Sequence, residues 1–470
     1  MFWTSAHIDV VMRRLAKKYG PVFTVYVGHK PQVIVADITI ANTLFKQKNY
    51  SGRPTLFTTQ FYTNENMCDI ATSDYDERWA ALRLIGHKAI VNYSRDEKLA
   101  KIISDCVDTT IRKISQKESN KPFKPNTYLF DLTFNIIAKS LFKKSIPLTD
   151  SEYDFIKYYC RDINNEFSGS RILLDLSPLF GWLFPQIAQK FSKAIIKFNQ
   201  FNYEKLKLHY LDSDRGGDDG YESVVQNYKL DTDDDDNDFC DAIIKAKRDG
   251  LRDNKQWSKY LTDRNLGLMV SNMFDTGVAT MDDSSQWLLL WMTYYPQCQQ
   301  LMRQEISEII GDQQPRHSDR YQCHYVMAFI AEMLRYMSLL SFYHKTLETT
   351  KIEKYTVPKN TIVLLYLGHV MREDSQWGTD GHSFRPERFI DTDTGHYTGS
   401  KCPQLIPYSV GLRKCVAEKL ANATLFIICV RLLQSTKRIE LADSQGISPD
   451  PLISDRRLPR AYKIVIEPNI

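Results

Sequence analysis

The chain has 470 residues, enough for roughly three average domains or for one large unit. Hydrophobic residues make up 43% of it and charged residues 25%, which is ordinary for a folded protein and excludes global disorder, collagen and coiled-coil fibre. The 61 Lys and Arg exceed the 57 Asp and Glu by four, so the net charge of +4 gives no argument for nucleic-acid binding.

The sequence lacks the patterns typical of a transmembrane helix, a signal peptide, a disulfide framework or a structural zinc site. No run approaches 18 apolar residues, and the start Met1-Phe2-Trp3 lacks a basic region followed by an apolar core, so we expect neither a transmembrane helix nor a signal peptide. The nine Cys are scattered, odd in number and without a C-x-x-C pair. This pattern argues against a disulfide framework or a structural zinc site and favours reduced thiols.

The first third of the chain is expected to be mostly helical. A helix is predicted at residues 6–19, ended by Gly20-Pro21, and a hairpin at residues 22–35, because β-branched and aromatic residues flank the turn signal at 28–31. Another helix is predicted at 38–48. Residues 75–210 have a largely helical pattern with breaks at 122–126 and 178–185, and the apolar segment 173–184 is expected to be a buried or lipid-facing loop.

Residues 212–238 carry a dense run of Asp. A block of like charge cannot pack, so we expect an acidic surface loop inside the domain. A calcium loop is disfavoured because the EF-hand spacing and its closing Glu are missing.

The second half alternates long helices with short strands. A helical pattern covers 262–310 with a bend or pause at Gly277 and Pro296, and helices are also expected at 317–337 and 416–434. Strands are predicted at 345–349, 355–357, 362–366 and 459–467, with an irregular segment at 371–414. Without repeats or a Gly/Ser linker, residues 1–470 should form one large, mainly α domain with small β-sheets.

The segment most informative about chemistry is the turn-rich loop 407–418, which runs into an apolar helix. Cys415 there sits at a helix N-terminus, where free N–H groups and the helix dipole stabilise a thiolate. Arg413 adds positive charge, and Gly411 permits close approach of the backbone to a flat partner. By themselves these residues are equally compatible with a buried structural Cys.

The loop resembles the haem-ligand signature F-x-x-G-x-R-x-C-x-G of the cytochrome P450 superfamily, here with Tyr408 and Ala417 in place of its Phe and last Gly. Two further motifs fit that family: an E-x-x-R at residues 332–335 and a P-E-R-F at residues 386–389. Residues 19–53 are similar to the first sheet and following helix of animal microsomal drug- and steroid-metabolising members. The resemblance spans essentially the whole chain and implies the P450-type helical fold.

The resemblance implies a haem b cofactor with its iron bound by the thiolate of Cys415. It further implies a structural ion-pair cluster and a set of haem-binding residues, whose cations and N–H donors would neutralise two buried propionates. The ion-pair cluster is Glu332, Arg335 and Arg388, and the haem-binding set is Arg53, Trp79, Arg83, His344, Gly411, Arg413 and Cys415.

The distal helix departs from the family pattern A/G-G-x-D/E-T. Gly277 and Thr280 match as the catalytic positions, but Ala279 replaces the acid that helps to organise proton delivery. Three interpretations stay open. Water and Thr280 suffice, or Asp283 one helical turn away substitutes, or the protein does not activate dioxygen in the normal way.

A lipophilic substrate such as a sterol, fatty acid or xenobiotic is the expectation, because the segments that correspond to the family's pocket are rich in apolar and aromatic residues. The pocket candidates are Phe57, Phe61, Phe180, Phe274 and Phe342. Electrons would come from NADPH through a flavoprotein reductase, with a cytochrome b-type protein as a second candidate donor. The chain is expected to insert one atom of dioxygen as a monooxygenase, to act as a monomer and to bind no nucleic acid.

Two alternatives remain: a redox-neutral isomerase that rearranges peroxides, and a catalytically impaired haem-binding protein. The resemblance also implies the cytoplasmic face of the endoplasmic reticulum membrane, with peripheral membrane contact. Microsomal relatives carry an N-terminal anchor before the segment matched at Tyr19-Gly20-Pro21. We therefore expect either a truncated form of a membrane-bound enzyme or an enzyme that has lost its anchor.

Overall fold

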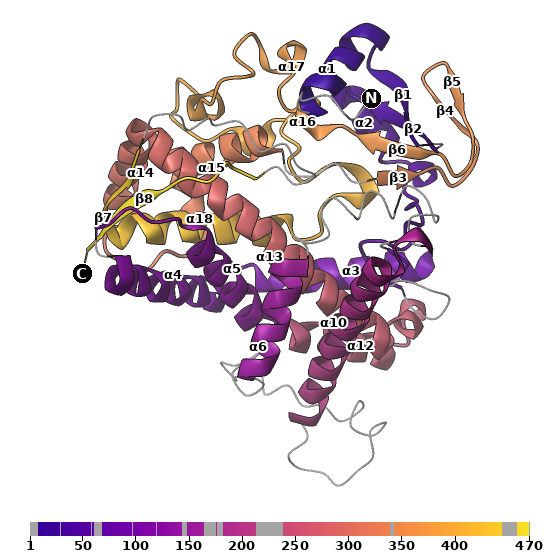
Figure 1. The fold of residues 1–470 in the computed structure, drawn as a ribbon, viewed down its shortest axis with the longest axis horizontal. Coiled ribbons are helices and arrows are strands. Elements are labelled where there is room, and N and C mark those ends of the chain that lie inside the picture. The colour runs from indigo at the N-terminus through magenta and orange to yellow at the C-terminus, as the bar shows by residue number, and fades with distance from the viewer. Residues whose placement is uncertain are drawn as a thin grey trace.

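Helices dominate the computed structural model (Figure 1). It describes residues 8–28, 30–57, 59–60, 68–95, 97–118, 120–142, 148–163, 175, 182–212, 238–338, 343–443 and 458–469. Most of the predicted acidic loop, residues 213–237, and most of the segment 173–184 lie outside the described residues. Within them, no helix is long and apolar enough to cross a membrane.

The helix α13 (Asp263–Tyr294) runs through the middle of the molecule (Figure 1). It begins at Thr262, whose side chain accepts a hydrogen bond from the N–H of Asn265. Because most of its side chains are buried, the helix packs on several sides, including against α5 (Asn126–Leu141) and α10 (Pro185–Asp212). The predicted pause at Pro296 is confirmed, since α14 starts there, whereas Gly277 lies inside one continuous helix.

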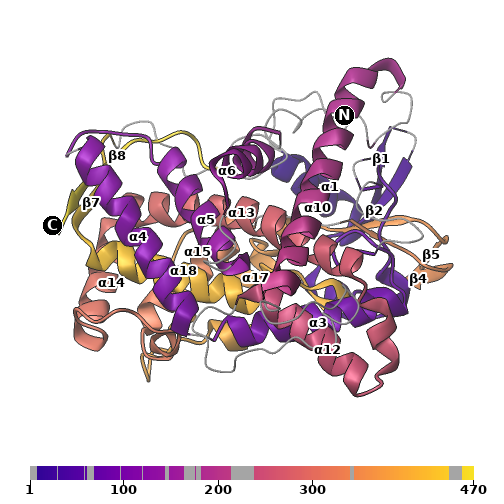
Figure 2. The same cartoon turned by 90° about the horizontal axis from the view of Figure 1, so that it is seen from below.

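The other long helices lie around α13, apart from α1, which lies beside the N-terminal strands (Figures 1 and 2). They are α1 (Ile8–Tyr19), α3 (Glu77–Tyr93), α4 (Glu97–Glu118), α6 (Asp150–Lys157), α12 (Phe239–Arg252), α14 (Pro296–Ile309), α15 (His324–Met337) and α18 (Glu418–Gln434). Shorter helices are α2 (Ile38–Leu44), α16 (Leu367–Val370) and α17 (Asp374–Trp377), and a π-helical turn, η2 (Tyr158–Ile163), follows α6. The buried faces of the long helices except α1 share one large hydrophobic core, whereas Met12 and Ala16 of α1 belong to a separate small cluster.

The strands form small sheets at two ends of the molecule (Figure 2). The predicted hairpin is confirmed as β1 (Val22–Val27) and β2 (Lys30–Val35), which pair antiparallel. β2 pairs parallel with β6 (Ile362–Leu365), and β6 pairs antiparallel with β3 (Tyr343–Lys345). The two-stranded sheets are β4 (Thr350–Ile352) with β5 (Tyr355–Val357), and β7 (Thr436–Leu441) with β8 (Ile464–Pro468).

The predicted strand at 345–349 is wrong in its position. Strands occupy residues 343–345 and 350–352, and the residues between them bond elsewhere. The N–H of Leu347 donates to the carbonyl of Asn49, and the Thr346 hydroxyl donates to the carbonyl of Pro358. The backbone there serves these long-range contacts rather than a strand ladder.

Glu332 on α15 lies at the centre of a buried ion cluster. Arg335 donates from Nε and Nη2 to the two carboxylate oxygens at 2.7 and 2.8 Å, and Arg388 donates from Nε at 3.0 Å. The remaining N–H groups of Arg335 donate to carbonyls of Met371, Gly381 and Ser383. The charge is thus shared by several hydrogen bonds and joins α15 to the irregular segment 371–390.

The substitution Glu332→Ala is expected to destabilise the fold strongly, because it leaves the fully buried Arg335 without its counter-charge. Loss of one partner of a buried pair costs about 3–5 kcal/mol in the free energy of unfolding. Denaturant titration measures this cost. The control Arg252→Ala removes a guanidinium that is 74% exposed and should change the free energy of unfolding by less than about 0.5 kcal/mol. Equal effects of the two variants would contradict the assignment.

Candidate functional site

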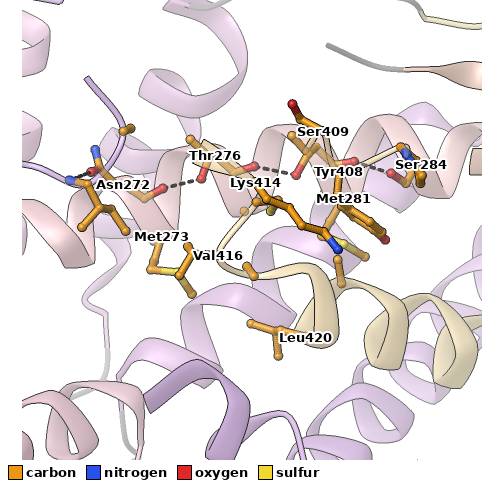
Figure 3. A pocket seen from close by; sticks show the side chains of 18 of the residues that line it. Asn272, Met273, Thr276, Met281, Ser284, Tyr408, Ser409, Lys414, Val416 and Leu420 are labelled. Atoms are coloured by element: carbon orange, nitrogen blue, oxygen red, sulfur yellow. Dashed lines mark hydrogen bonds between the residues drawn. The ribbon is translucent and has the colours of Figure 1, made fainter. Parts of the chain in front are cut away.

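A cavity lies between α13 and the loop that precedes α18 (Figure 3). Its walls combine apolar side chains with three arginines, several hydroxyls and one thiol. The lining residues are Arg53, Ile70, Ala71, Arg83, Ile137, Asn272, Met273, Thr276, Gly277, Thr280, Met281, Ser284, Leu334, Met337, Pro407, Tyr408, Ser409, Arg413, Lys414, Cys415, Val416, Ala417, Leu420, Ala421, Thr424 and Leu425.

The loop is held in place by a close backbone approach at Gly411. This residue has φ +77°, and a Cβ added to it would lie 1.9 Å from the carbonyl oxygen of Phe45. The next N–H, of Leu412, donates to that same oxygen at 2.9 Å. Gly411 therefore lets the loop lie against the end of α2, a role different from the approach to a flat partner expected from the sequence.

Cys415 follows this contact and borders the cavity. Its N–H donates to the carbonyl of Tyr408 at 2.9 Å, and the Tyr408 hydroxyl donates to Asn422 on α18 at 2.7 Å. Cys415 is solvent-exposed because it faces the cavity, and protein surrounds it on its other sides. Burial raises the pKa of the thiol, while the N–H of Ala417 and the charge of Arg83 oppose that shift. A metal cation would deprotonate such a thiol.

Three guanidinium groups meet at one end of the cavity. Arg413 donates from Nε to the carbonyl of Ser51 at 2.7 Å and from Nη2 to the carbonyl of Ser73 at 2.6 Å. Its buried Nη1 has no hydrogen-bond partner among the described residues. Arg53 donates to carbonyls of Ala71 and Tyr343, and Arg83 donates to the carbonyl of Lys414, the residue before Cys415.

The charge at this end of the cavity is unbalanced. Burial and the repulsion of Arg53 and Arg83 lower the pKa of Arg413 to about 8, and burial lowers the pKa of Arg53 to about 10. Asp69 and Asp74 provide counter-charge, and Asp74 also pairs with Lys345 at 2.6 Å. The four cations outnumber the two carboxylates by two. A ligand with two carboxylates and a free acceptor for Arg413 Nη1 fits this end of the cavity.

Two of the predicted haem-binding residues lie behind the arginines. Trp79 donates from Nε1 to the carbonyl of Ile70 at 3.1 Å, and its ring lies 3.9 Å from the guanidinium carbon of Arg413. The Nδ1 of His344 lies 2.8 Å from the carbonyl of Tyr50, and burial together with Arg53 lowers the pKa of His344 to about 3. Trp79 supports Arg413 by a cation–π contact, and His344 is neutral at physiological pH.

The opposite wall is one face of α13, and it carries the two predicted catalytic positions, Gly277 and Thr280. The hydroxyls form a ladder, each donating to the carbonyl four residues earlier: Thr276 to Asn272 at 2.6 Å, Thr280 to Thr276 at 2.8 Å and Ser284 to Thr280 at 2.7 Å (Figure 3). Asp283 is buried but is not among the residues that line the cavity. Its placement disfavours it as a substitute for the missing acid at Ala279.

Of the predicted pocket phenylalanines, the two that the structure describes, Phe57 and Phe274, do not line this cavity. Phe274 is fully buried in an aromatic cluster with Phe134, Phe142 and Phe198, on a side of α13 that does not line the cavity. Phe57 packs against the main core. The other three candidates, Phe61, Phe180 and Phe342, lie outside the described residues.

Sequence reasoning missed two groups at the site. Met281 lines the apolar part of the cavity beyond the predicted lining segment 270–280, and its spacing of four residues from Gly277 could have placed it on the same helical face. Asp69 and Asp74 were missed because their role depends on arginines far away in the sequence.

Comparison with known proteins assigns a family to this architecture. Residues 1–450 match the family model described as Cytochrome P450. Cytochrome P450 1A1 of Felis catus is 27% identical over 459 residues, covering 94% of this chain and 83% of that protein. Steroid 17-alpha-hydroxylase/17,20 lyase of Ictalurus punctatus is 26% identical over 475 residues, covering 98% and 85%, and cytochrome P450 2C23 of Rattus norvegicus is 26% identical over 478 residues, covering 98% and 89%.

The substitution Gly411→Ala is expected to displace the loop and to lower the haem content of the purified protein severely, because the new Cβ would overlap the Phe45 carbonyl. The matched control is Gly395→Ala, a glycine with similar φ of +70° and nothing within 4 Å of the added Cβ. Both variants carry the backbone strain of a positive φ, roughly 1 kcal/mol. Absorbance of bound haem per chain measures the difference, and equal haem content would refute the steric argument.

Proposed function

The chain belongs to the cytochrome P450 family, and we propose that this haem-thiolate monooxygenase inserts one atom of dioxygen into a lipophilic substrate held against α13. One observation carries the proposal. A single cavity has a thiol, a surplus of buried cationic charge and a hydroxyl-bearing helix wall.

The residues of the cavity fit a haem. Arg53, Arg83 and Arg413 would hold its two propionates, and the partnerless Nη1 of Arg413 supports this role. Cys415 would be the ligand of the iron, and the haem, when bound, would supply the redox chemistry of oxygen activation. The loop contacts at Tyr408 and Gly411 fix the sulfur position, so the chain itself determines where the iron would sit.

Proton delivery is proposed to pass through Thr280 and water. The Thr280 hydroxyl lies on the cavity wall and donates to the carbonyl of Thr276, which leaves its oxygen lone pairs to accept a hydrogen bond from water. Rotation of the hydroxyl away from that carbonyl would let it pass a proton onward. Thr276 and Ser284 supply further hydroxyls on the same face, one turn before and one turn after. Three hydroxyls in a row support water-mediated transfer without the acid that Ala279 replaces.

The substrate is proposed to be a sterol, a fatty acid or a xenobiotic. The apolar part of the cavity is formed by Ile137, Met273, Met281, Leu334 and Met337, and these side chains offer no charge to a ligand. Flexible Met side chains adapt to ligands of different shape. The relative named as a steroid hydroxylase supports this class.

Electrons are proposed to come from an NADPH-dependent flavoprotein reductase, with a cytochrome b-type protein as a second donor. A hollow borders the Cys415 loop and is lined by four basic side chains, Lys46, Arg320, Lys414 and Lys419. Such a surface favours an acidic partner. Peripheral contact with the cytoplasmic face of the endoplasmic reticulum membrane is proposed with it.

An isomerase that rearranges peroxides is the second candidate, and Ala279 favours it. The two functions differ in their need for electrons. The monooxygenase turns over only with reductase and NADPH, whereas the isomerase converts a lipid peroxide without any reductant.

The reduced, CO-bound protein is expected to absorb at the position typical of thiolate-ligated haem, because Cys415 borders the cavity. Cys415→Ser should abolish that band, and the control Cys402→Ser should keep it, since Cys402 does not line this cavity. The reading is the CO difference spectrum of each protein. A histidine-type band in the unmodified protein would overturn the proposal.

Thr280→Ala is expected to lower product formed per NADPH by tenfold or more, since general acid–base groups contribute about 10²–10⁴-fold. Asp283→Asn should leave this ratio unchanged, because Asp283 does not line the cavity. Product and NADPH are measured together with reductase present. Loss of coupling in the Asp283 variant alone would show that Asp283 supplies the proton.

A further inference from the structure

Three side chains of metal-binding types meet outside the Cys415 cavity, at the junction of α10 and α12. His209 lies in the last turn of α10, Asp238 caps the N-terminus of α12, and Cys240 lies in the first turn of α12. One donor atom from each residue lies within 4.8 Å of the others, and all three residues are buried. The two helices lie side by side in both views (Figures 1 and 2).

The imidazole of His209 is oriented as in a metal ligand. Its Nδ1 lies 2.8 Å from the carbonyl of Lys205, one turn earlier on α10. A hydrogen bond from Nδ1–H to a carbonyl fixes the ring and leaves Nε2 as the atom that faces outward, which is the usual second-shell arrangement of metal-bound His. Here Nε2 faces Asp238 Oδ2 at 2.8 Å.

Neighbouring contacts hold the carboxylate and both helices. Asp238 Oδ1 accepts the N–H of Asp241 at 3.0 Å, so only Oδ2 is directed toward His209. Tyr210 on α10 and Lys247 on α12 both contact Asp263 Oδ1 at the start of α13, at 2.8 and 2.6 Å. The shared contact with Asp263 thus fixes α10 and α12 relative to each other, independently of the pair formed by His209 and Asp238.

We propose that His209, Asp238 and Cys240 bind a divalent metal ion of the zinc class and so join α10 to α12. Zinc–ligand distances of about 2.0–2.3 Å in a tetrahedron place the donor atoms about 3.3–3.7 Å apart. The nitrogen and the oxygen, 2.8 Å apart, need to separate by about half an ångström, and the sulfur, within 4.8 Å of both, needs to approach by at most about 1 Å. Rotation of the three side chains can supply both movements.

Binding of the ion would release protons. Without the ion, both ring nitrogens of His209 face acceptors, the Lys205 carbonyl and the Asp238 carboxylate, so the imidazole is protonated, and Cys240 is a thiol. The buried Asp241 lies beside the cluster and donates its N–H to Asp238. When the ion binds, the Nε2 proton and the thiol proton leave to solvent, and two anionic ligands neutralise the dication. A water molecule can take the fourth position. The scattered Cys spacing argues against a zinc finger, and this site differs from one because only one of its ligands is a Cys.

The test is zinc binding by the purified holoenzyme after chelator treatment, zinc reloading and removal of excess metal. Elemental analysis is expected to give one zinc per chain in addition to the haem iron. X-ray absorption at the zinc edge should show one sulfur neighbour at about 2.3 Å with nitrogen or oxygen at about 2.0–2.2 Å. This measurement needs no variant, and the haem iron does not interfere with it.

Cys240→Ser should remove the sulfur neighbour and weaken zinc binding at least tenfold, the lower end of what even outer-shell changes cost. Cys106→Ser, which changes a buried thiol on α4, should bind zinc normally. If Cys240→Ser does not fold, His209→Gln serves in its place. Zinc at background level, a zinc shell without sulfur, or unchanged affinity in the folded variants would overturn the proposal and leave a buried His–Asp ion pair.

Discussion

The contact between Gly411 and Phe45 is the constraint on which the site depends. The backbone of the loop can lie against the end of α2 only because no Cβ stands between them. From that fixed point, Arg413 reaches the carbonyls of Ser51 and Ser73, and Cys415 follows with its surface toward the cavity. Because Gly411 has no Cβ, the loop before α18 can contact the end of α2, and this contact joins the β-rich end of the molecule to the helical core.

The second constraint is electrostatic. Arg413 is buried, and Arg53 and Arg83 are half-buried beside it. Burial and the repulsion of these two neighbours lower the pKa of Arg413, and carbonyls and two aspartates compensate only part of the charge. Such a cluster is costly without an anionic partner. We therefore regard the cationic end of the cavity as built for a ligand, and the family assignment makes a haem with two propionates that ligand.

The two walls of the cavity carry different chemical groups. The loop before α18 provides the thiol and the charge, while α13 provides hydroxyls and flexible apolar side chains. Because α13 is buried along most of its length, its face toward the cavity is rigidly placed. The proposed metal cluster at α10 and α12 lies next to the start of the same helix and would add to that rigidity.

Features whose residues are close together in the chain could be predicted without the structure. The loop 407–418, the hairpin at 22–35 and the helical face through Gly277 and Thr280 depend on local spacing, which backbone geometry converts directly into structure. The spacing pattern alone was enough to predict where these elements lie. The strand predicted at 345–349 was misplaced because Leu347 and Thr346 bond to Asn49 and Pro358 instead.

Contacts between side chains that are distant in the chain could be identified only from the folded structure. It placed Phe274 in an aromatic core, used the Trp79 N–H for the carbonyl of Ile70, and brought Asp69 and Asp74 to the arginines. It also joined His209 to Asp238 and Cys240 across two helices. These outcomes depend on packing and charge between residues far apart in the chain, and local periodicity carries no information about such distances.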